Sequence, residues 1–205
     1  HGIGAWSEKD FVNAVRHGVS PEGKHYYPSF PYTAYANMTD QDITDLWVYF
    51  KSIPKSSKPS IDHDLPMYLR WRRPLAFWKI LNKREPIIEL VSVDTTLQRG
   101  AYLVETLGHC GECHTPRNFI GGLQYEYWLG GAKNPAGRGM IPNITSSKLN
   151  WNTEEIVEYL ASGFTPDFDV AGGHMAHVIE NTSKLTEEDR IAIAEYLKAI
   201  PGVQK

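Results

Sequence analysis

Two stretches of the chain share one pattern of apolar and polar positions. Residues 6–21 and 151–166 each begin with tryptophan, continue with apolar residues at helical spacing, and end with glycine and proline, at a shift of 145 residues (151 − 6). The pattern predicts a short helix in each stretch, with a capping box at its start and a left-handed glycine at its end. The predicted capping pairs are Ser7 with Asp10 and Asn152 with Glu155, and the predicted terminating residues are Gly18 and Gly163.

A second pair of helical patterns lies at residues 38–54 and 185–201, at a shift of 147 residues (185 − 38). Thr39 and Thr186 are the predicted N-caps, and each stretch ends at a proline, which stops a helix. The connection between the two helices is two residues longer in the second copy, because the shift grows from 145 to 147. Internal repetition of this kind predicts two copies of one domain.

The chain has two cysteines, and both lie in one motif, Cys110-Gly111-Glu112-Cys113-His114. A Cys-x-x-Cys-His run is the attachment sequence of c-type haem, in which the two thiols bind the vinyl groups and the histidine ligates the iron. The motif therefore predicts one covalently attached haem c, with Cys110 and Cys113 as the attachment residues and His114 as the proximal ligand.

Two other chemistries use cysteines at this spacing. A zinc site built from His109, Cys110, Cys113 and His114 would need four ligands that are too close in sequence to close a tetrahedron easily. A thioredoxin-like redox pair would need a βαβ pattern, whereas the flanks of this motif have the pattern of a helix and a loop. Haem attachment is the interpretation that the flanking sequence favours.

Only the second copy of the repeat is complete. Residues 97–108 have the pattern of a helix directly before the motif, and Cys110 precedes Trp151 by 41 residues (151 − 110). In the first copy only five residues precede Trp6. We expect the corresponding attachment segment to lie upstream of His1 and to be missing through truncation or proteolysis. A degenerate, haem-free first domain is the alternative.

Composition narrows the class of protein. A chain of 205 residues with 41% hydrophobic residues suits one or two compact domains, and a net charge of −3 argues against a nucleic-acid partner. No 18-residue apolar run is present to span a membrane. The first residues lack the charged and apolar regions of a signal peptide, so we expect a mature or truncated product.

Residues 55–94 form the predicted connector between the copies. The segment is rich in serine, proline and basic residues, and its middle, which includes Leu69-Arg70-Trp71-Arg72-Arg73-Pro74, is too hydrophobic for a free linker. We expect it to lie across a domain surface, with contact to a partner or to a membrane surface as the alternative.

Several motifs resemble one known family over nearly the whole chain. The sequence around residues 99–118, the Pro142-Asn143-Ile144-Thr145 turn and the Met175-Ala176-His177 run are similar to the multi-haem cytochrome c subunits of bacterial periplasmic dehydrogenases for alcohols, aldehydes and gluconate. Residues 2–6 and 27–32 resemble the latter half of the preceding haem domain in such subunits.

The resemblance implies an all-α fold with two cytochrome c-type domains in tandem, the first lacking its haem-attachment segment. The expected boundaries are 1–54 for the C-terminal part of the first domain, 55–94 for the connector and 95–205 for a complete domain. It also implies a close crossing of the first and last helices of a domain, with Gly100 and Tyr196 at the crossing point. The expected location is the periplasm, in possible association with the outer face of the inner membrane.

The second iron ligand is expected in the loop between the two later helices. Met175 lies there after a pair of glycines and matches the family's ligand position, with His174 and His177 as alternatives. Subtracting the two repeat shifts, 145 and 147, from position 175 gives residues 28–30 of the first copy, where no ligand exists. Met38, or otherwise His25, would therefore serve a second haem if one is present. Arg117 and Asn143 are candidate donors to the haem propionates.

These features predict an electron-transfer protein that takes electrons from a dehydrogenase subunit and passes them towards a downstream cytochrome, an oxidase or a quinone pathway. No independent catalytic constellation is visible, so we do not expect the chain to be an enzyme by itself. The alternative is a di-haem enzyme, similar to a thiosulfate dehydrogenase or a peroxidase, with substrate at a weakly ligated haem.

Overall fold

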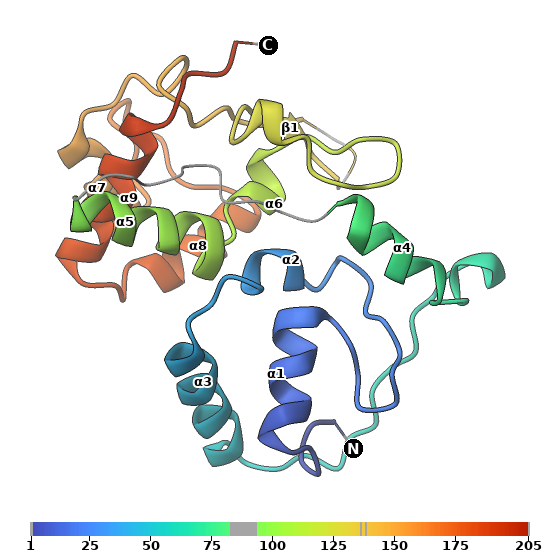
Figure 1. Ribbon diagram of the computed structural model, residues 1–205. Coiled ribbons are helices and arrows are strands. Elements are labelled where there is room, and N and C mark those ends of the chain that lie inside the picture. The colour runs from blue at the N-terminus through green and yellow to red at the C-terminus, as the bar shows by residue number, and fades with distance from the viewer. Residues whose placement is uncertain (1, 83–93, 136, 138, 205) are drawn as a thin grey trace. The chain divides into compact units, whose positions relative to one another are not determined.

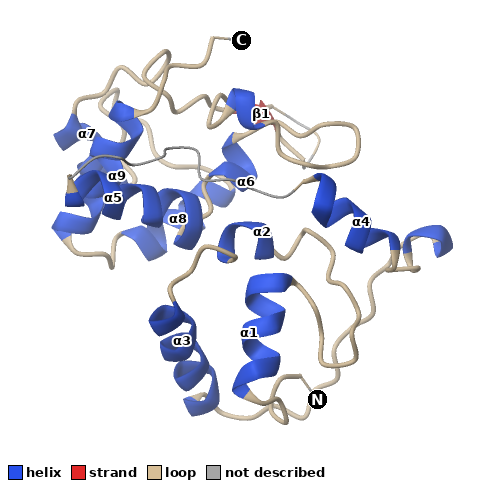
Figure 2. Ribbon diagram, in the orientation of Figure 1, coloured by secondary structure: helices blue, strands red, loops and turns tan. Residues whose placement is uncertain are grey.

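The computed structural model describes residues 2–82, 94–135, 137 and 139–204. The described chain is mostly helical, as predicted, with one short antiparallel pair of strands, β1 (Ala132–Lys133) and β2 (Met140–Ile141) (Figures 1 and 2). It forms two compact units, residues 1–85 and 86–205. The predicted connector, 55–94, falls partly outside the described residues, and its described part up to residue 82 belongs to the first unit.

The first unit is built around helices α1 and α3, each of which has an N-cap residue. Helix α1 packs against both α2 and α3, and the buried side chains include Phe11, Val15, Tyr32 and Ile43. The elements of this unit are α1 (Glu8–His17), α2 (Tyr32–Tyr35), α3 (Asp40–Ser52), the 3₁₀ helix η1 (Met67–Leu69) and α4 (Pro74–Leu81).

The second unit has the larger core. Helix α5 packs along α9, α9 also contacts α7, and α7 contacts α8 (Figure 1). The core includes Val104, Trp128, Leu129 and Tyr196. The elements are α5 (Thr95–Ala101), the π-helix η2 (Tyr102–Leu107), α6 (Gly111–His114), the 3₁₀ helix η3 (Tyr125–Tyr127), β1, β2, α7 (Thr153–Ser162), α8 (His174–Thr182) and α9 (Glu187–Ala199).

The predicted helix caps are confirmed. Ser7 and Asp10 form a capping box at α1, and Asn152 and Glu155 form one at α7, so each helix begins where its first unpaired amides are satisfied. Thr39 and Thr186 are the N-caps of α3 and α9. The predicted terminating glycines adopt positive φ angles, 58° at Gly18 and 82° at Gly163.

The turn that follows α1 in the first unit is repeated after α7 in the second unit. In both units the backbone folds back into an isolated antiparallel bridge, Val19 with His25 and Phe164 with Val170, at the same 145-residue shift as the sequence. The two turns close with equivalent 2.8 Å hydrogen bonds, from Tyr26 N to Gly18 O and from Ala171 N to Gly163 O. The repeat is therefore structural as well as sequential.

A glycine permits the close approach of α5 and α9 in the second unit. A Cβ atom added at Gly100 of α5 would lie 2.0 Å from the backbone oxygen of Ala192 and 2.8 Å from Cβ of Tyr196, both in α9. The crossing of a small residue against an aromatic one, expected from the resemblance, is confirmed. It fixes the helix that leads into the Cys-x-x-Cys-His motif against the last helix of the chain.

The same two helices are joined by an ion pair. Arg99 donates from Nε and Nη2 to the two carboxylate oxygens of Asp189 at 2.7 and 2.8 Å, and this arginine lowers the pKa of Asp189. A carboxylate whose pKa is lowered by folding stabilises the fold above its unfolded pKa, near 3.8, and loses that contribution as the pH falls further.

We therefore expect Asp189→Asn to lower the free energy of unfolding by about 1 kcal/mol at neutral pH. The difference from wild type should shrink as the pH falls below 3.8 and vanish once the pH is below the lowered pKa of folded Asp189. Guanidinium titrations at several pH values would measure it. Asp167→Asn, at an exposed position after α7, is the control and should change nothing; a difference that persisted at low pH would contradict the ion-pair explanation.

Candidate haem-binding site

One helical turn carries the predicted attachment residues. In α6 the amides of Cys113 and His114 both donate to the carbonyl of Cys110, at 3.3 and 3.0 Å. Residues three and four positions apart lie on the same side of a helix, so the two sulfurs and the imidazole share one side of this turn. That is the arrangement that two thioether bonds and an axial imidazole require of a single segment.

The helix before the attachment turn changes from α-helical to π-helical winding just before the cysteine motif. The segment Tyr102–Leu107 is a π-helix, and it ends with hydrogen bonds from Gly108 N to Leu103 O, 2.7 Å, and from Cys110 N to Val104 O, 3.0 Å. His109 then takes a positive φ of 38°. Because π-helical turns widen a helix and recur at functional sites, this feature turns the chain into the cysteine motif rather than continuing the α-helix.

The ring of Trp128 packs against the attachment turn at Gly111. Gly111 lies so close to Trp128 that an added Cβ would be 2.0 Å from ring atom Cζ3. Trp128 Nε1 donates to the Tyr196 hydroxyl at 3.1 Å, and that hydroxyl donates to Glu105 Oε1 at 2.7 Å. All three side chains are buried, so the network links the motif to α9 and to the π-helix.

His114 is set up as a metal ligand through one nitrogen. Its Nδ1 lies 2.9 Å from the carbonyl oxygen of Pro142. A carbonyl oxygen can only accept a hydrogen bond, so Nδ1 must carry the proton and donate it. The assigned tautomer therefore leaves Nε2 with a free lone pair. Burial lowers the pKa of His114, which favours the neutral imidazole that ligates metals.

The thiols do not have the environment of a redox pair. Burial raises the pKa of the Cys110 thiol to about 11, and it also raises the pKa of Cys113. Reactive cysteines have lowered pKa values, because the thiolate is the nucleophile. In the described parts of the chain the strands are the two-residue antiparallel pair alone, without the βαβ unit of a thioredoxin.

A zinc site is not formed either. Among the described residues, no three His, Cys, Asp or Glu side chains converge on a point where a metal ion could bind. The donor set of this turn, two thiols and one imidazole with a fixed tautomer, fits haem c. Exposed apolar side chains before and after Met175 would also suit a large apolar macrocycle, namely Phe164, Phe168, Val170 and Val178.

The structure places the remaining predicted ligands on other elements. Met175 is half-buried in the first turn of α8, directly after Gly173, whose φ is 56°. Met38 is buried in the first unit at 7% exposure and precedes the N-cap of α3, and its carbonyl accepts a 2.8 Å hydrogen bond from Arg16. His25 Nδ1 lies 3.0 Å from Lys79 Nζ. The roles of these residues as iron ligands stay predictions.

The two predicted propionate donors already have partners within the protein. Arg117 forms an ion pair with Glu112 at 2.5 Å and donates to Gly121 O at 2.8 Å. Asn143 follows Pro142 in sequence, and its Nδ2 donates to Val203 O at 2.8 Å and to Ser147 Oγ at 3.3 Å. Donation to propionates stays a prediction, and for Asn143 it would require this network to rearrange.

Sequence reasoning named Trp128 only as an aromatic that shields the haem from water, and it missed the hydrogen bonds of Trp128, Glu105 and the Pro142 carbonyl that shape the site. The Pro142 carbonyl is a backbone atom, and Glu105 and Trp128 are joined through Tyr196, which is 91 residues from Glu105, so helical periodicity gives no signal for these contacts. The tight Gly111 contact needs the structure to identify Trp128 as its partner.

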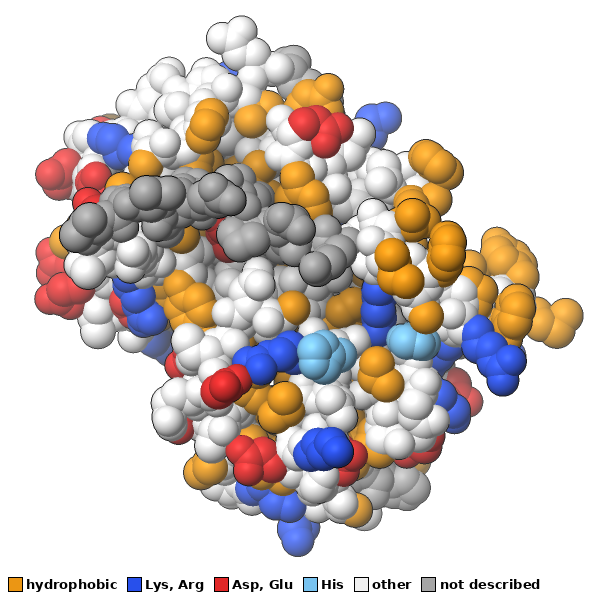
Figure 3. All heavy atoms as spheres, viewed as in Figure 1, with side chains coloured by type: hydrophobic (Ala, Val, Ile, Leu, Met, Phe, Trp, Pro, Cys, Tyr) orange, Lys and Arg blue, Asp and Glu red, His pale blue; other side chains and the backbone are white. Residues whose placement is uncertain are grey.

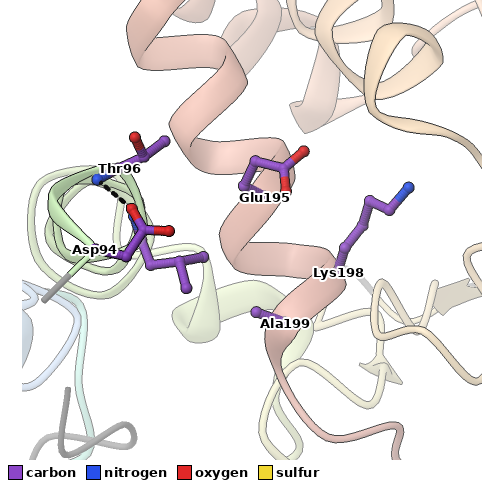
Figure 4. A pocket seen from close by; sticks show the side chains of 6 residues that line it. Asp94, Thr96, Glu195, Lys198 and Ala199 are labelled. Carbon is purple, nitrogen blue, oxygen red and sulfur yellow. Dashed lines mark hydrogen bonds between the residues drawn. The ribbon is translucent and has the colours of Figure 1, made fainter. Parts of the chain in front are cut away.

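A separate pocket lies at the other end of α5. It is lined by Asp94, Thr96 and Leu97 at the start of α5 and by Glu195, Lys198 and Ala199 near the end of α9 (Figure 4). Asp94 accepts a 2.8 Å hydrogen bond from Thr96 N there and acts as the N-cap of α5. The pocket contains no residue of the cysteine motif and is open to solvent, so it does not extend the candidate site.

Comparison with known proteins gave matches over nearly the whole of this chain, whereas no family model matched. The chain is 52% identical over 204 residues to a "Diheme cytochrome c-type" protein of Cereibacter sphaeroides, covering 100% of this chain and 69% of that protein. It is 36% identical over 210 residues to the fructose dehydrogenase cytochrome subunit of Gluconobacter japonicus, and 33% identical over 222 residues to the cytochrome c subunit of a quinone alcohol dehydrogenase of Gluconobacter oxydans. The chain spans 43% and 45% of the length of these two subunits.

Within the described ranges, every helix is too short or too polar to cross a bilayer.

Proposed function

Because this chain belongs to the family of diheme c-type cytochromes, we propose that it is an electron-transfer protein that receives electrons one at a time from a dehydrogenase and passes them towards the respiratory chain. The observation that supports this most directly is the α6 turn, in which Cys110, Cys113 and His114 share one side and His114 Nδ1 is held by Pro142 O at 2.9 Å. A carrier needs only a firmly held, fully ligated haem.

Each residue has a defined task in this proposal. Cys110 and Cys113 would attach the haem, His114 would ligate its iron through Nε2, and Met175 would supply the second protein ligand. Haem c, when bound, supplies a one-electron couple between ferrous and ferric iron. The carbonyl of Pro142 keeps the proton of His114 on Nδ1, and Trp128 keeps the attachment turn from shifting.

The domain organisation is part of the proposal. We propose one cytochrome c domain over residues 95–205, a copy of the latter part of that domain over residues 1–54, and a connector over residues 55–94. The repeated capping boxes and the repeated turns, at one constant shift, support this division. A haem of the first domain would use Met38, or otherwise His25, as its ligand.

The names of the relatives suggest the partners. The matches include the cytochrome subunits of one fructose dehydrogenase, one gluconate dehydrogenase and three alcohol dehydrogenases. We propose a dehydrogenase subunit as the electron donor, an oxidase or quinone pathway as the acceptor, and a periplasmic location at the outer face of the inner membrane.

Intact mass and haem spectra of the purified chain test the proposal. We expect one haem retained under denaturing conditions and a six-coordinate spectrum that does not change when carbon monoxide is added to the reduced protein. His114→Ala should abolish this spectrum, whereas His109→Asn, next to the same motif and tolerant of a positive φ, should preserve it. Rapid carbon monoxide binding by the wild-type protein would instead favour the di-haem enzyme.

A further inference from the structure

One segment of the chain has a charge opposite to the rest. Residues 65–84 contain six Arg and Lys residues and no Asp or Glu, although the whole chain has a net charge of −3. The remaining residues therefore carry 15 basic and 24 acidic side chains, a net charge of −9. Such asymmetry gives the molecule a preferred orientation towards an anionic surface.

Helix α4, in this segment, has its apolar side facing outwards. Its cation, Lys79, faces the first unit, where Nζ donates to the carbonyls of His17 and Gly18 at 2.5 and 2.8 Å and lies over the ring of Tyr32 at 4.5 Å. Phe77 and neighbouring apolar residues face solvent instead. This is the reverse of an ordinary surface helix, which turns its apolar side to the core.

The exposed apolar side chains continue into η1. We name as the α4 patch six residues that are each 62% to 85% exposed, namely Met67, Tyr68, Trp71, Phe77, Ile80 and Leu81. Hydrophobic side chains gather at the right edge of Figure 3, where Figure 1 places α4 and η1, with Lys and Arg side chains beside them.

The segment is fixed to the first unit rather than loose. The Tyr27 hydroxyl donates to Leu69 O at 2.7 Å, and the Arg72 guanidinium lies 4.8 Å from the centre of the Tyr27 ring. Together with the three acceptors of Lys79, these contacts orient the backbone so that the patch stays outside. The exposure of the patch is thus imposed by specific polar contacts.

Resting on the membrane-surface location in the proposed function, we propose that the α4 patch docks the protein on an anionic phospholipid surface. Aromatic and aliphatic side chains interleaved with arginines suit the boundary between headgroups and acyl chains, where rings and long aliphatic chains insert and guanidinium groups meet phosphates. The charge of −9 elsewhere is repelled by the same surface, so the patch is the face presented to lipid. An acidic protein partner would satisfy the arginines, but lipid also covers six large apolar side chains without needing a matched groove.

Co-sedimentation with vesicles tests this proposal on the haem-loaded chain. We expect binding to vesicles of phosphatidylcholine with about a third phosphatidylglycerol, weak binding to phosphatidylcholine alone, and loss of binding as salt is raised. Phe77→Glu/Ile80→Glu should lower the partition coefficient at least about tenfold. Val48→Glu, 61% exposed on α3 of the same unit, is the matched control and should bind like wild type.

A second variant keeps the test valid if the first is misfolded. Arg70→Glu/Arg73→Glu leaves the apolar residues in place and should remove the preference for anionic vesicles without changing the circular dichroism spectrum. The proposal is overturned if neither kind of vesicle binds the protein or if Phe77→Glu/Ile80→Glu binds as well as wild type. The haem spectrum, read on the same samples, reports separately on electron-carrier function.

Discussion

Replacing Met175 by alanine is expected to leave haem attached at Cys110 and Cys113 but to lower its reduction potential by on the order of 100 mV or more. A thioether is a soft ligand that stabilises ferrous iron, so its loss favours the ferric state. The weak charge-transfer band of methionine-ligated ferric haem should disappear as well. Redox titration and the absorption spectrum of the oxidised protein measure both effects.

Met140→Ala is the matched control for this prediction. Met140 lies in the same unit, on β2, and is 69% exposed, so its loss should alter neither the band nor the potential. If the Met175 variant keeps both, the ligand is another residue, and His174 and His177 on the same helix are next to be replaced. If the Met175 variant loses the haem altogether, the attachment turn depends on α8 more than its own contacts indicate.

The helices could be predicted because their boundaries are set by local chemistry. Ser7 with Asp10 and Asn152 with Glu155 cap helices through bonds that span three residues, and Gly18 and Gly163 end them through a backbone conformation that other residues avoid. These signals need no tertiary contact. The cysteine motif is equally local, because its three functional residues lie within one helical turn.

The shape of the site could not be predicted in the same way. The π-helix before the motif has the same apolar spacing as an ordinary helix, and its hydrogen bonds to Gly108 and Cys110 become visible only in the folded chain. Trp128 and Glu105 meet through Tyr196, which is 68 residues from Trp128 in sequence. Long-range packing decides these positions, and one sequence contains no direct record of it.

Asn143 is a second residue whose contacts could not be predicted from the sequence. Its place in a Pro-Asn-Ile-Thr turn makes it a candidate donor to a haem propionate, and that role stays a prediction. In the folded chain its oxygen accepts from Thr145 N at 2.8 Å, and its nitrogen donates to the carbonyl of Val203. The turn is thereby tied to the end of the chain, a use that depends on residues 60 positions away.

Gly100→Ala is expected to destabilise the second unit by about 3 kcal/mol, against the usual effect of this substitution. In a helix, alanine is normally more favourable than glycine by about 1 kcal/mol. Here the new Cβ would lie 2.0 Å from the backbone oxygen of Ala192, so α5 and α9 must move apart. Shortening a side chain cannot relieve the clash, since the nearest atom is a backbone oxygen. Ala192→Gly should therefore fail to rescue the variant.

The sign of the change is what separates this explanation from helix propensity. Guanidinium unfolding, followed by haem absorbance as a probe of the second unit, should show an earlier midpoint for Gly100→Ala. Gly4→Ala, where an added Cβ meets no heavy atom within 4 Å, should keep the wild-type midpoint. A stabilised Gly100→Ala protein would mean that the two helices tolerate separation. The crossing would then not be what holds the π-helix, and the haem-attachment turn after it, in place.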